Sequence, residues 1–149
     1  MIVRTATIED LDILIDFGQR LTKESPHFQK QGFNVQRAEA VFIHLINKGS
    51  IFIVYDQYDN AVGGLIGCMD IDWRTGHKLA FEQGVFVLPE YRSTGVATQL
   101  VEAFKAWAID HHADRIQIGT MTGIYAEKTV SLYEGLGFEL KGFVLEMEV

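Results

Sequence analysis

Residues 85–100, which read VFVLPEYRSTGVATQL, join a β-strand pattern to an amphipathic helix pattern through one short turn. The apolar run stops at Pro89, which cannot donate to a sheet ladder, and Gly95 stands just ahead of the helical positions. The first amides of a helix lack partners within the helix and lie at the positive end of its dipole. The chain must therefore fold with a strand end, an anion-binding turn and a helix N-terminus side by side.

The small residues of this turn, Gly95 and Ala97, allow a diphosphate to approach the backbone amides of residues 94–98. Arg92 would add a fork of charged donors beside that anion. The spacing is neither that of the P-loop, G-x-x-x-x-G-K followed by Ser or Thr, nor that of the dinucleotide fingerprint, G-x-G-x-x-G. The turn thus predicts a diphosphate site of a third kind.

The composition of the chain argues against several other classes of protein. Its 149 residues and 48% apolar content suit one domain with a core of its own, without disulfides or a structural metal. A formal net charge of -7 argues against a nucleic-acid-binding surface and agrees with a cationic amine substrate. The one cysteine, Cys68, rules out an internal disulfide and favours a cytoplasmic location. We expect no signal peptide, because charged residues such as Arg4 and Glu9 interrupt the N-terminal residues, and no membrane span, because no apolar run approaches ~20 residues.

Hydrophobic periodicity predicts two helices early in the chain, a run of strands, and then alternating helices and strands. The expected strands cover residues 2–6, 51–55, 62–71, 79–87, 116–118 and 138–149. The expected helices begin near residues 7–10, 34, 95 and 127 and end near residues 25, 49, 108 and 136. Strands separated by helices need crossovers, which give parallel neighbours, whereas the central run forms an antiparallel meander. The chain is therefore predicted to have an α+β (mixed α/β) fold with a central mixed, mostly antiparallel sheet.

Two motifs resemble those of the GNAT superfamily of N-acetyltransferases. Arg92-Ser93-Thr94-Gly95-Val96-Ala97 is similar to its acetyl-CoA signature, R/Q-x-x-G-x-G/A, and residues 132–138, LYEGLGF, are similar to a second block downstream. The element order β-α-α-β-β-β-α-β-α-β resembles the GNAT fold over residues 1–149, as a single N-acetyltransferase domain. The resemblance implies acetyl-CoA as co-substrate and transfer of its acetyl group to a primary amine of a small molecule or protein.

The resemblance also implies which residues contact acetyl-CoA. In the family, the pantetheine arm pairs with the backbone of the strand before the turn, and the diphosphate lies on the turn. A strand edge with unpaired N–H and C=O groups can bind an extended ligand, so side chains there can be buried while the backbone binds. The matching positions are Val85, Phe86 and Val87 on the strand, and Arg92, Ser93, Thr94, Gly95, Val96, Ala97 and Thr98 on the turn.

Three residues are candidates for acid–base catalysis. Tyr133 matches the tyrosine that in many family members lies near the cofactor sulfur and acts as general acid. Alignment on Pro89 and Arg92 places Gln83, rather than Glu82, where many relatives carry a glutamate. In a regular strand Glu82 would point away from the cofactor and Gln83 would orient a water, whereas a bulge would turn Glu82 inward as general base. The sequence leaves both arrangements open.

The sequence also leaves a non-catalytic function open. Ala126 stands where many relatives carry an asparagine, and this change, with the misaligned carboxylate, would suit a GNAT-fold acyl-CoA-binding sensor or protein-interaction module. The acceptor would contact residues 21–34 and 72–78, where acidic and aromatic side chains such as Glu24 could bind an amine. No metal is expected, because the cluster DHHAD at residues 110–114 falls at a predicted helix C-terminus. A nucleic-acid or membrane partner is not expected, and a homodimer is left open.

Overall fold

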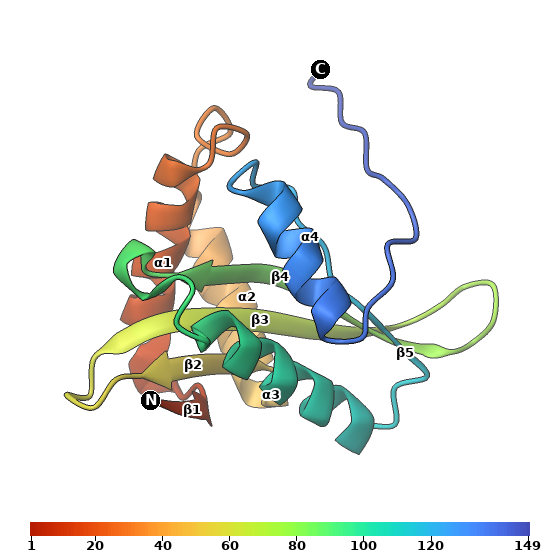
Figure 1. The fold of residues 1–149 in the computed structure, drawn as a ribbon, viewed down its shortest axis with the longest axis horizontal. Helices are drawn as coiled ribbons and strands as arrows, with labels where there is room; N and C mark the ends of the chain where they lie inside the picture. Colours follow the sequence, from red (N-terminus) through yellow and green to blue (C-terminus); the bar gives the residue numbers. More distant parts are fainter.

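The computed structural model describes all 149 residues, Met1–Val149, and contains one five-stranded sheet (Figure 1). The strands are β1 (Ile2–Thr5), β2 (Ile51–Tyr55), β3 (Ala61–Ile71), β4 (Lys78–Val87) and β5 (Arg115–Gln117). The α-helices are α1 (Leu11–Glu24), α2 (Val35–Lys48), α3 (Val96–Asp110) and α4 (Ala126–Gly135), with 3-10 turns η1 (Ile8–Asp10) and η2 (Pro89–Tyr91).

The sheet follows the chain, with strand order β1-β2-β3-β4-β5. Strands β1 to β4 pair antiparallel, whereas β4 and β5 pair parallel. The parallel pair needs a crossover, and α3 supplies it by carrying the chain back along the sheet. The predicted α+β fold with a mixed, mostly antiparallel sheet is confirmed.

Alternation along the buried strand β2 divides the core into two layers. Phe52 and Val54 face a cluster that includes the apolar side of α3, whereas Ile51 and Ile53 face a cluster formed with α1 and α2. Successive side chains of a strand point to opposite faces, so one strand supplies both layers. The sheet is thereby fixed from both sides, which gives the later strands a rigid frame.

The helix boundaries agree with the capping signals in the sequence. Asn34 Oδ1 accepts a hydrogen bond from the Arg37 backbone N–H at 2.9 Å, which satisfies a free amide at the start of α2. Gly49 ends the same helix in the left-handed conformation, with φ of 71°. No helix combines the length and the apolar character that crossing a bilayer requires.

The prediction of a last strand over residues 138–149 is wrong for this chain. No residue after Phe138 makes a backbone–backbone hydrogen bond, and in Figure 1 the segment rises past α4 to the C-terminus without joining the sheet. A strand needs a second strand for its N–H and C=O groups, and periodicity reports the side chains rather than that partner. The observed order therefore stops at α4.

Candidate functional site

The sheet opens between β4 and β5. Residues 79–81 of β4 pair with β5, and β4 then continues to Val87 without a neighbour on that side. The groove beside this free edge encloses about 2140 Å³, well above the roughly 300–1,000 Å³ of a site for one small ligand. Val85, Phe86 and Val87 line it, and the side chains of Phe86 and Val87 are buried. The expected arrangement, with side chains in the core and a backbone edge open to a ligand, is present.

The turn after β4 presents a row of free amides. None of the backbone N–H groups of residues 93–98 donates a hydrogen bond within the chain, and the first helical bond runs from Gln99 N to Gly95 O at 3.0 Å. Ser93 and Gly95 both have positive φ, of 66° and 92°, which turns successive amides into a concave surface. A Cβ on Gly95 would meet no protein atom within 4 Å, so the space in front of the turn is open.

Arg92 does not point its guanidinium into that space. Its Nε donates to the Val87 carbonyl at 3.0 Å, and both terminal nitrogens bind the carboxylate of Glu24, with Nη2 to Oε1 at 2.6 Å. The hydrogen bond from Arg92 lowers the pKa of Glu24, so the pair is charged. Glu24, expected from the sequence to be available for an amine, is instead paired with Arg92 of the turn after β4. Nothing in the local sequence signals a contact between positions so far apart.

Glu82 lies in the groove because β4 carries a bulge. Gly67 of β3 pairs with Glu82 and Ile66 pairs with Gly84, so Gln83 is the extra residue. Gly67 is required on the partner strand, since a Cβ there would come within 2.8 Å of the Phe104 ring. Of the two arrangements that the sequence left open, the structure has the bulged one.

The bulge places Glu82 where burial makes its ionised form unfavourable. Its Oε1 accepts a hydrogen bond from the Gly119 backbone N–H at 2.9 Å, just beyond the end of β5. Burial raises the pKa of Glu82 to about 7, and the Gly119 bond offsets this only in part. The Gln83 side chain is exposed and forms no hydrogen bond within the chain, although it borders the same groove.

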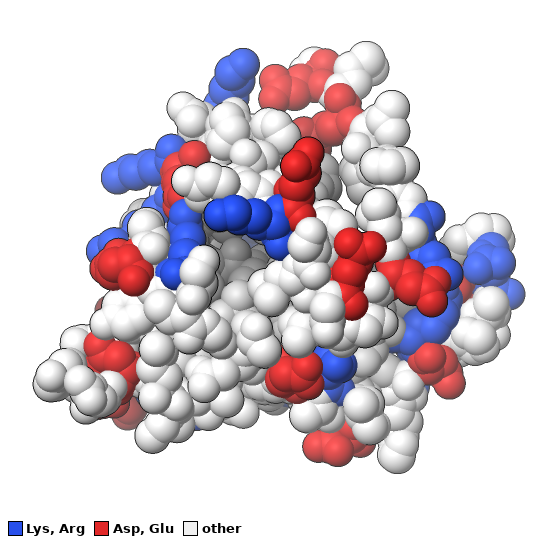
Figure 2. Space-filling model, in the orientation of Figure 1, with Lys and Arg blue, Asp and Glu red and all other residues white.

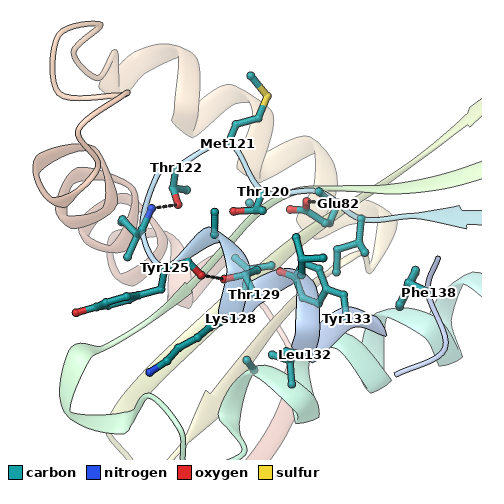
Figure 3. A pocket seen from close by; sticks show the side chains of 18 of the residues that line it. Glu82, Thr120, Met121, Thr122, Tyr125, Lys128, Thr129, Leu132, Tyr133 and Phe138 are labelled. Carbon is teal, nitrogen blue, oxygen red and sulfur yellow. Dashed lines mark hydrogen bonds between the residues drawn. The ribbon is translucent and has the colours of Figure 1, made fainter. Parts of the chain in front are cut away.

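Tyr133 of α4 shares this groove with Glu82 (Figure 3). It is buried, packs against Phe138 with ring centroids 6.3 Å apart, and its hydroxyl forms no hydrogen bond within the chain. Burial first, and the charge of Glu82 second, raise the pKa of the Tyr133 hydroxyl. The site therefore holds a phenol that stays protonated and a carboxyl that titrates near neutrality, on two elements far apart in the sequence.

Two contacts that the sequence did not predict close one end of the groove. Ser25 Oγ donates to the Thr122 carbonyl at 2.5 Å, and His27 Nδ1 lies 2.8 Å from the Met121 carbonyl. They tie the loop after α1 to the loop before α4. Because they join backbone carbonyls to side chains more than ninety residues away, no motif could have found them.

The histidine cluster after α3 has structural partners. His111 Nδ1 lies 2.8 Å from the Trp107 carbonyl, and Asp114 accepts a hydrogen bond from the Lys78 backbone N–H at 2.8 Å. The first contact stays within the last turn of α3, and the second fastens the segment after α3 to the start of β4. No group of three or more His, Cys, Asp or Glu side chains in the chain is placed to hold a metal ion.

Known proteins resemble this chain in both sequence and fold. The model of the acetyltransferase (GNAT) family matches residues 15–138. An N-alpha-acetyltransferase of Saccharolobus solfataricus is 30% identical, with 98% of this chain and 87% of that protein covered. An aminoglycoside N(6')-acetyltransferase type 1 of Acinetobacter baumannii is 57% identical over 59 residues, which are 38% of this chain. The match spans about 40% of the length of that relative and of a second aminoglycoside N(6')-acetyltransferase.

The solved structures share the whole fold at low identity. AAC(6')-Iy in complex with the bisubstrate analogue CoA-S-monomethyl-acetylneamine has a TM-score of 0.78 and 21% identity, covering 99% of this chain and 97% of that one. The same protein with CoA bound has a TM-score of 0.75 and 22% identity, covering 99% and 93%.

These matches confirm the resemblance found in the two motifs. GNAT acetyltransferases use acetyl-CoA, and membership supports N-acetyl transfer rather than a non-catalytic acyl-CoA module. The match includes the strand end, the turn and the helix that carries Tyr133. The chain belongs to the acetyltransferase (GNAT) family.

Proposed function

We propose that residues 1–149 form one N-acetyltransferase domain in which Glu82 is the general base and Tyr133 the general acid. The observation that carries the proposal is the bulge at Gln83, which turns Glu82 into the groove where β4 leaves β5. A base is most effective when its pKa lies near the working pH, and the pKa of Glu82 is raised to about 7. Gln83 has no such advantage and serves at most to orient a water at the mouth of the groove.

The donor site follows the free backbone. The pantetheine arm pairs with the open edge of Val85, Phe86 and Val87, and the diphosphate lies on the amides of residues 93–98. The free amides and the two left-handed residues, Ser93 and Gly95, support this placement. Arg92 contributes by holding the end of β4 through the Val87 carbonyl.

Acid and base have separate tasks in the transfer. Acetyl-CoA supplies a thioester, whose C–S bond breaks as the amine nitrogen forms the new C–N bond. Glu82 takes the proton that the amine must lose, directly or through one water, and Tyr133 gives a proton to the departing thiolate. The raised pKa of Tyr133 keeps that proton available at neutral pH.

We propose that the acceptor is a primary amine on a cationic small molecule such as an amino sugar. Glu146 and Glu148 border the groove, whereas Glu139 is paired there with Lys141 at 2.8 Å, and acidic side chains gather where the chain ends in Figure 2. Charges of this sign favour a polycationic ligand. The aminoglycoside N(6')-acetyltransferases, so named, match part of the chain. A peptide N-terminus is the second candidate, because the N-alpha-acetyltransferase relative covers 98% of this chain.

The remaining partners are also part of the proposal. We place the protein in the cytoplasm, on the ground of its single cysteine, with no nucleic-acid or membrane partner, on the ground of its net charge of -7. We propose a homodimer, because apolar side chains near the C-terminus are uncovered.

Free-thiol release tests the activity. Purified protein is incubated with acetyl-CoA and, separately, with neamine, spermidine and a peptide with a free N-terminus. We expect amine-dependent thiol release, fastest with neamine and lost in Glu82→Gln. Fastest turnover of the peptide would support the second candidate. Tight acetyl-CoA binding without thiol release for any amine would overturn the catalytic proposal.

A further inference from the structure

The loop between β5 and α4, residues 118–124, lacks the backbone pairing that fixes most segments of a fold. None of its N–H or C=O groups makes a backbone–backbone hydrogen bond. Beyond Ile118, which packs on the core, three hydrogen bonds join the loop to the rest of the chain. The position of the loop therefore depends on the side chains that make these bonds.

Two of the three bonds come from the segment that follows α1. Ser25 Oγ donates to the Thr122 carbonyl at 2.5 Å, and His27 Nδ1 lies 2.8 Å from the Met121 carbonyl. A carbonyl can only accept, so His27 carries a proton on Nδ1. The loop lies close to this segment, since a Cβ on Gly123 would come within 3.1 Å of the His27 ring.

Ser25 is the firmer of the two anchors. Its backbone N–H donates to the Leu21 carbonyl at 2.9 Å and so closes the last turn of α1, while its Oγ also accepts from the Phe28 N–H at 3.1 Å. Ser25 is fully buried, whereas His27 is exposed. A buried hydrogen bond does not exchange with water, so the Ser25 bond is the stronger constraint on the loop.

The third bond joins the same loop to Glu82. The Gly119 N–H donates to Glu82 Oε1 at 2.9 Å, three residues before the carbonyl that Ser25 holds. Figure 3 shows Thr120 and Thr122 along the wall of the groove that also contains Glu82. Because the loop is so short, holding one end of it limits how far Gly119 can move from the carboxylate.

We propose that Ser25 is a positioning residue for Glu82: by holding the Thr122 carbonyl, it keeps the Gly119 N–H on the Glu82 carboxylate. The inference rests on the proposed function, in which Glu82 is the general base, and adds a residue that does not itself line the groove. A hydrogen bond donated to a carboxyl favours its ionised form. Without Ser25 the loop relaxes, Glu82 loses its one hydrogen bond within the chain, and its ionisation requires a higher pH.

No cation near Glu82 replaces this hydrogen bond. Cys68 of β3 and Tyr133 of α4 face Glu82, and burial first, with the charge of Glu82 second, raises the pKa of each, so both are neutral near pH 7. Strand β5 contributes Arg115, whose guanidinium is paired with Asp72. The loop itself carries no titratable side chain, so its backbone N–H is the group that stabilises the carboxylate.

The pH dependence of kcat/KM in Ser25→Ala, measured with the amine that turns over fastest, tests the positioning. We expect the acidic limb, near pH 7 in the unaltered protein, to move up by about one pH unit, as loss of a hydrogen bond to a charged group predicts. The rate should then fall about fivefold at pH 7 and recover almost fully at pH 9. Thr22→Val is the matched control, because it removes a hydroxyl–carbonyl bond within α1, to Gly18 at 2.8 Å, and leaves the loop in place.

A carbon-13 NMR titration of the Glu82 carboxyl, assigned by its absence in Glu82→Gln, measures the same shift without turnover. Ser25→Ala should raise the titration midpoint, and Thr22→Val should not. Gly123→Ala disturbs the contact from the side of the loop, since its φ is 72° and the new Cβ would press on His27. It should raise the midpoint as well, and it decides the question if Ser25→Ala does not fold.

Two results would overturn the positioning. One is an unchanged midpoint in folded Ser25→Ala, or in Gly123→Ala. The other is a rate that falls by the same factor at every pH in Ser25→Ala, which would mean that Ser25 only stabilises the fold. Retention of the acidic limb in Glu82→Gln would contradict the proposed function alone, because the NMR midpoint reports the carboxyl whatever its part in catalysis.

Discussion

The proposed donor side of the groove, formed by the edge of β4 and the turn after it, and the C-terminal rim are built in opposite ways. On the donor side the side chains of Phe86 and Val87 are buried in the core, while the strand edge and the turn amides are free to bind. On the rim, residues 139–149 expose their side chains, and the Gln31–Glu146 hydrogen bond joins them to the rest of the chain. In the proposed function the donor is bound by rigid backbone, whereas the acceptor meets side chains with few constraints. Substitutions on the two sides should therefore have different effects.

The largest effect is expected from Gly95→Val on the donor side. The left-handed φ of 92° is unfavourable for valine, and its side chain would fill the open space in front of the amides. Loss of two charge-assisted hydrogen bonds, at about 1.5–3 kcal/mol each, corresponds to at least a hundredfold weaker acetyl-CoA binding. Calorimetric titration with acetyl-CoA measures it.

Gly76→Val is the matched control for that substitution. Gly76 has a similar φ of 73° and equally open space, but lies in the loop before β4, away from the turn. The control should carry the same backbone strain and bind acetyl-CoA normally. Unchanged affinity in a folded Gly95→Val protein would remove the turn from the donor site.

Glu82→Gln should reduce kcat roughly a hundredfold, because the amide cannot accept the amine proton. In the unaltered enzyme, kcat/KM should fall below pH 7 as Glu82, with its pKa of about 7, becomes protonated. The variant should lose this acidic limb of the pH–rate profile. Retention of both the limb and the rate would show that another group is the base.

The same substitution should stabilise the protein at high pH. The pKa of Glu82 is about 7 in the folded protein against an ordinary 4.5, so folding costs more as pH rises from 4.5 through 7. The full cost above pH 7 is at most about 3 kcal/mol, at 1.36 kcal/mol for each pKa unit. Urea unfolding should find Glu82→Gln more stable than the unaltered protein at pH 8 and equal to it at pH 4. Equal stability at both would mean that Glu82 is solvated.

Tyr133→Phe should lower kcat about tenfold to a hundredfold and leave the dissociation constant of acetyl-CoA unchanged. The ring keeps its packing against Phe138, and the hydroxyl has no hydrogen bond in the chain to lose. The effect is smaller than that of Glu82→Gln because a thiolate is already a fair leaving group. Equal turnover in the two proteins would exclude Tyr133 as the acid.

The geometry of the turn after β4 could be predicted from the sequence, whereas that of the rest of the groove could not, for a physical reason. The turn is specified by neighbours in the chain, since Gly95 and the helix after it act locally. The direction of Glu82 depends on a bulge that Gly67 permits by lying against Phe104, which is a contact between distant elements. The prediction of a last strand failed for a similar reason, because the side-chain pattern of residues 138–149 suits an extended backbone but does not supply the backbone partner that a strand needs.

Arg92 shows both the local and the long-range effects. It belongs to the acetyl-CoA signature motif, but a contact with a residue distant in the sequence sets the direction of its side chain. The family signature suggests a phosphate ligand, whereas the structure pairs its guanidinium with Glu24 of α1. Both side chains are partly exposed, at 26% and 31%, so the pair should contribute no more than about 1 kcal/mol. A test on Glu24 separates the two roles without removing Arg92.

The smallest effect is therefore expected from Glu24→Gln, which should weaken acetyl-CoA binding about twofold to fivefold, as expected for a pair worth up to about 1 kcal/mol. The reason is that Arg92 loses a partner that fixes the turn, while the amides that bind the diphosphate remain. Asp16→Asn is the control, since it breaks the exposed Arg20–Asp16 pair on the same helix, away from the turn. Calorimetry with acetyl-CoA decides the sign: tighter binding in Glu24→Gln would mean that the released guanidinium reaches the diphosphate, and that Arg92 is a ligand which Glu24 holds back.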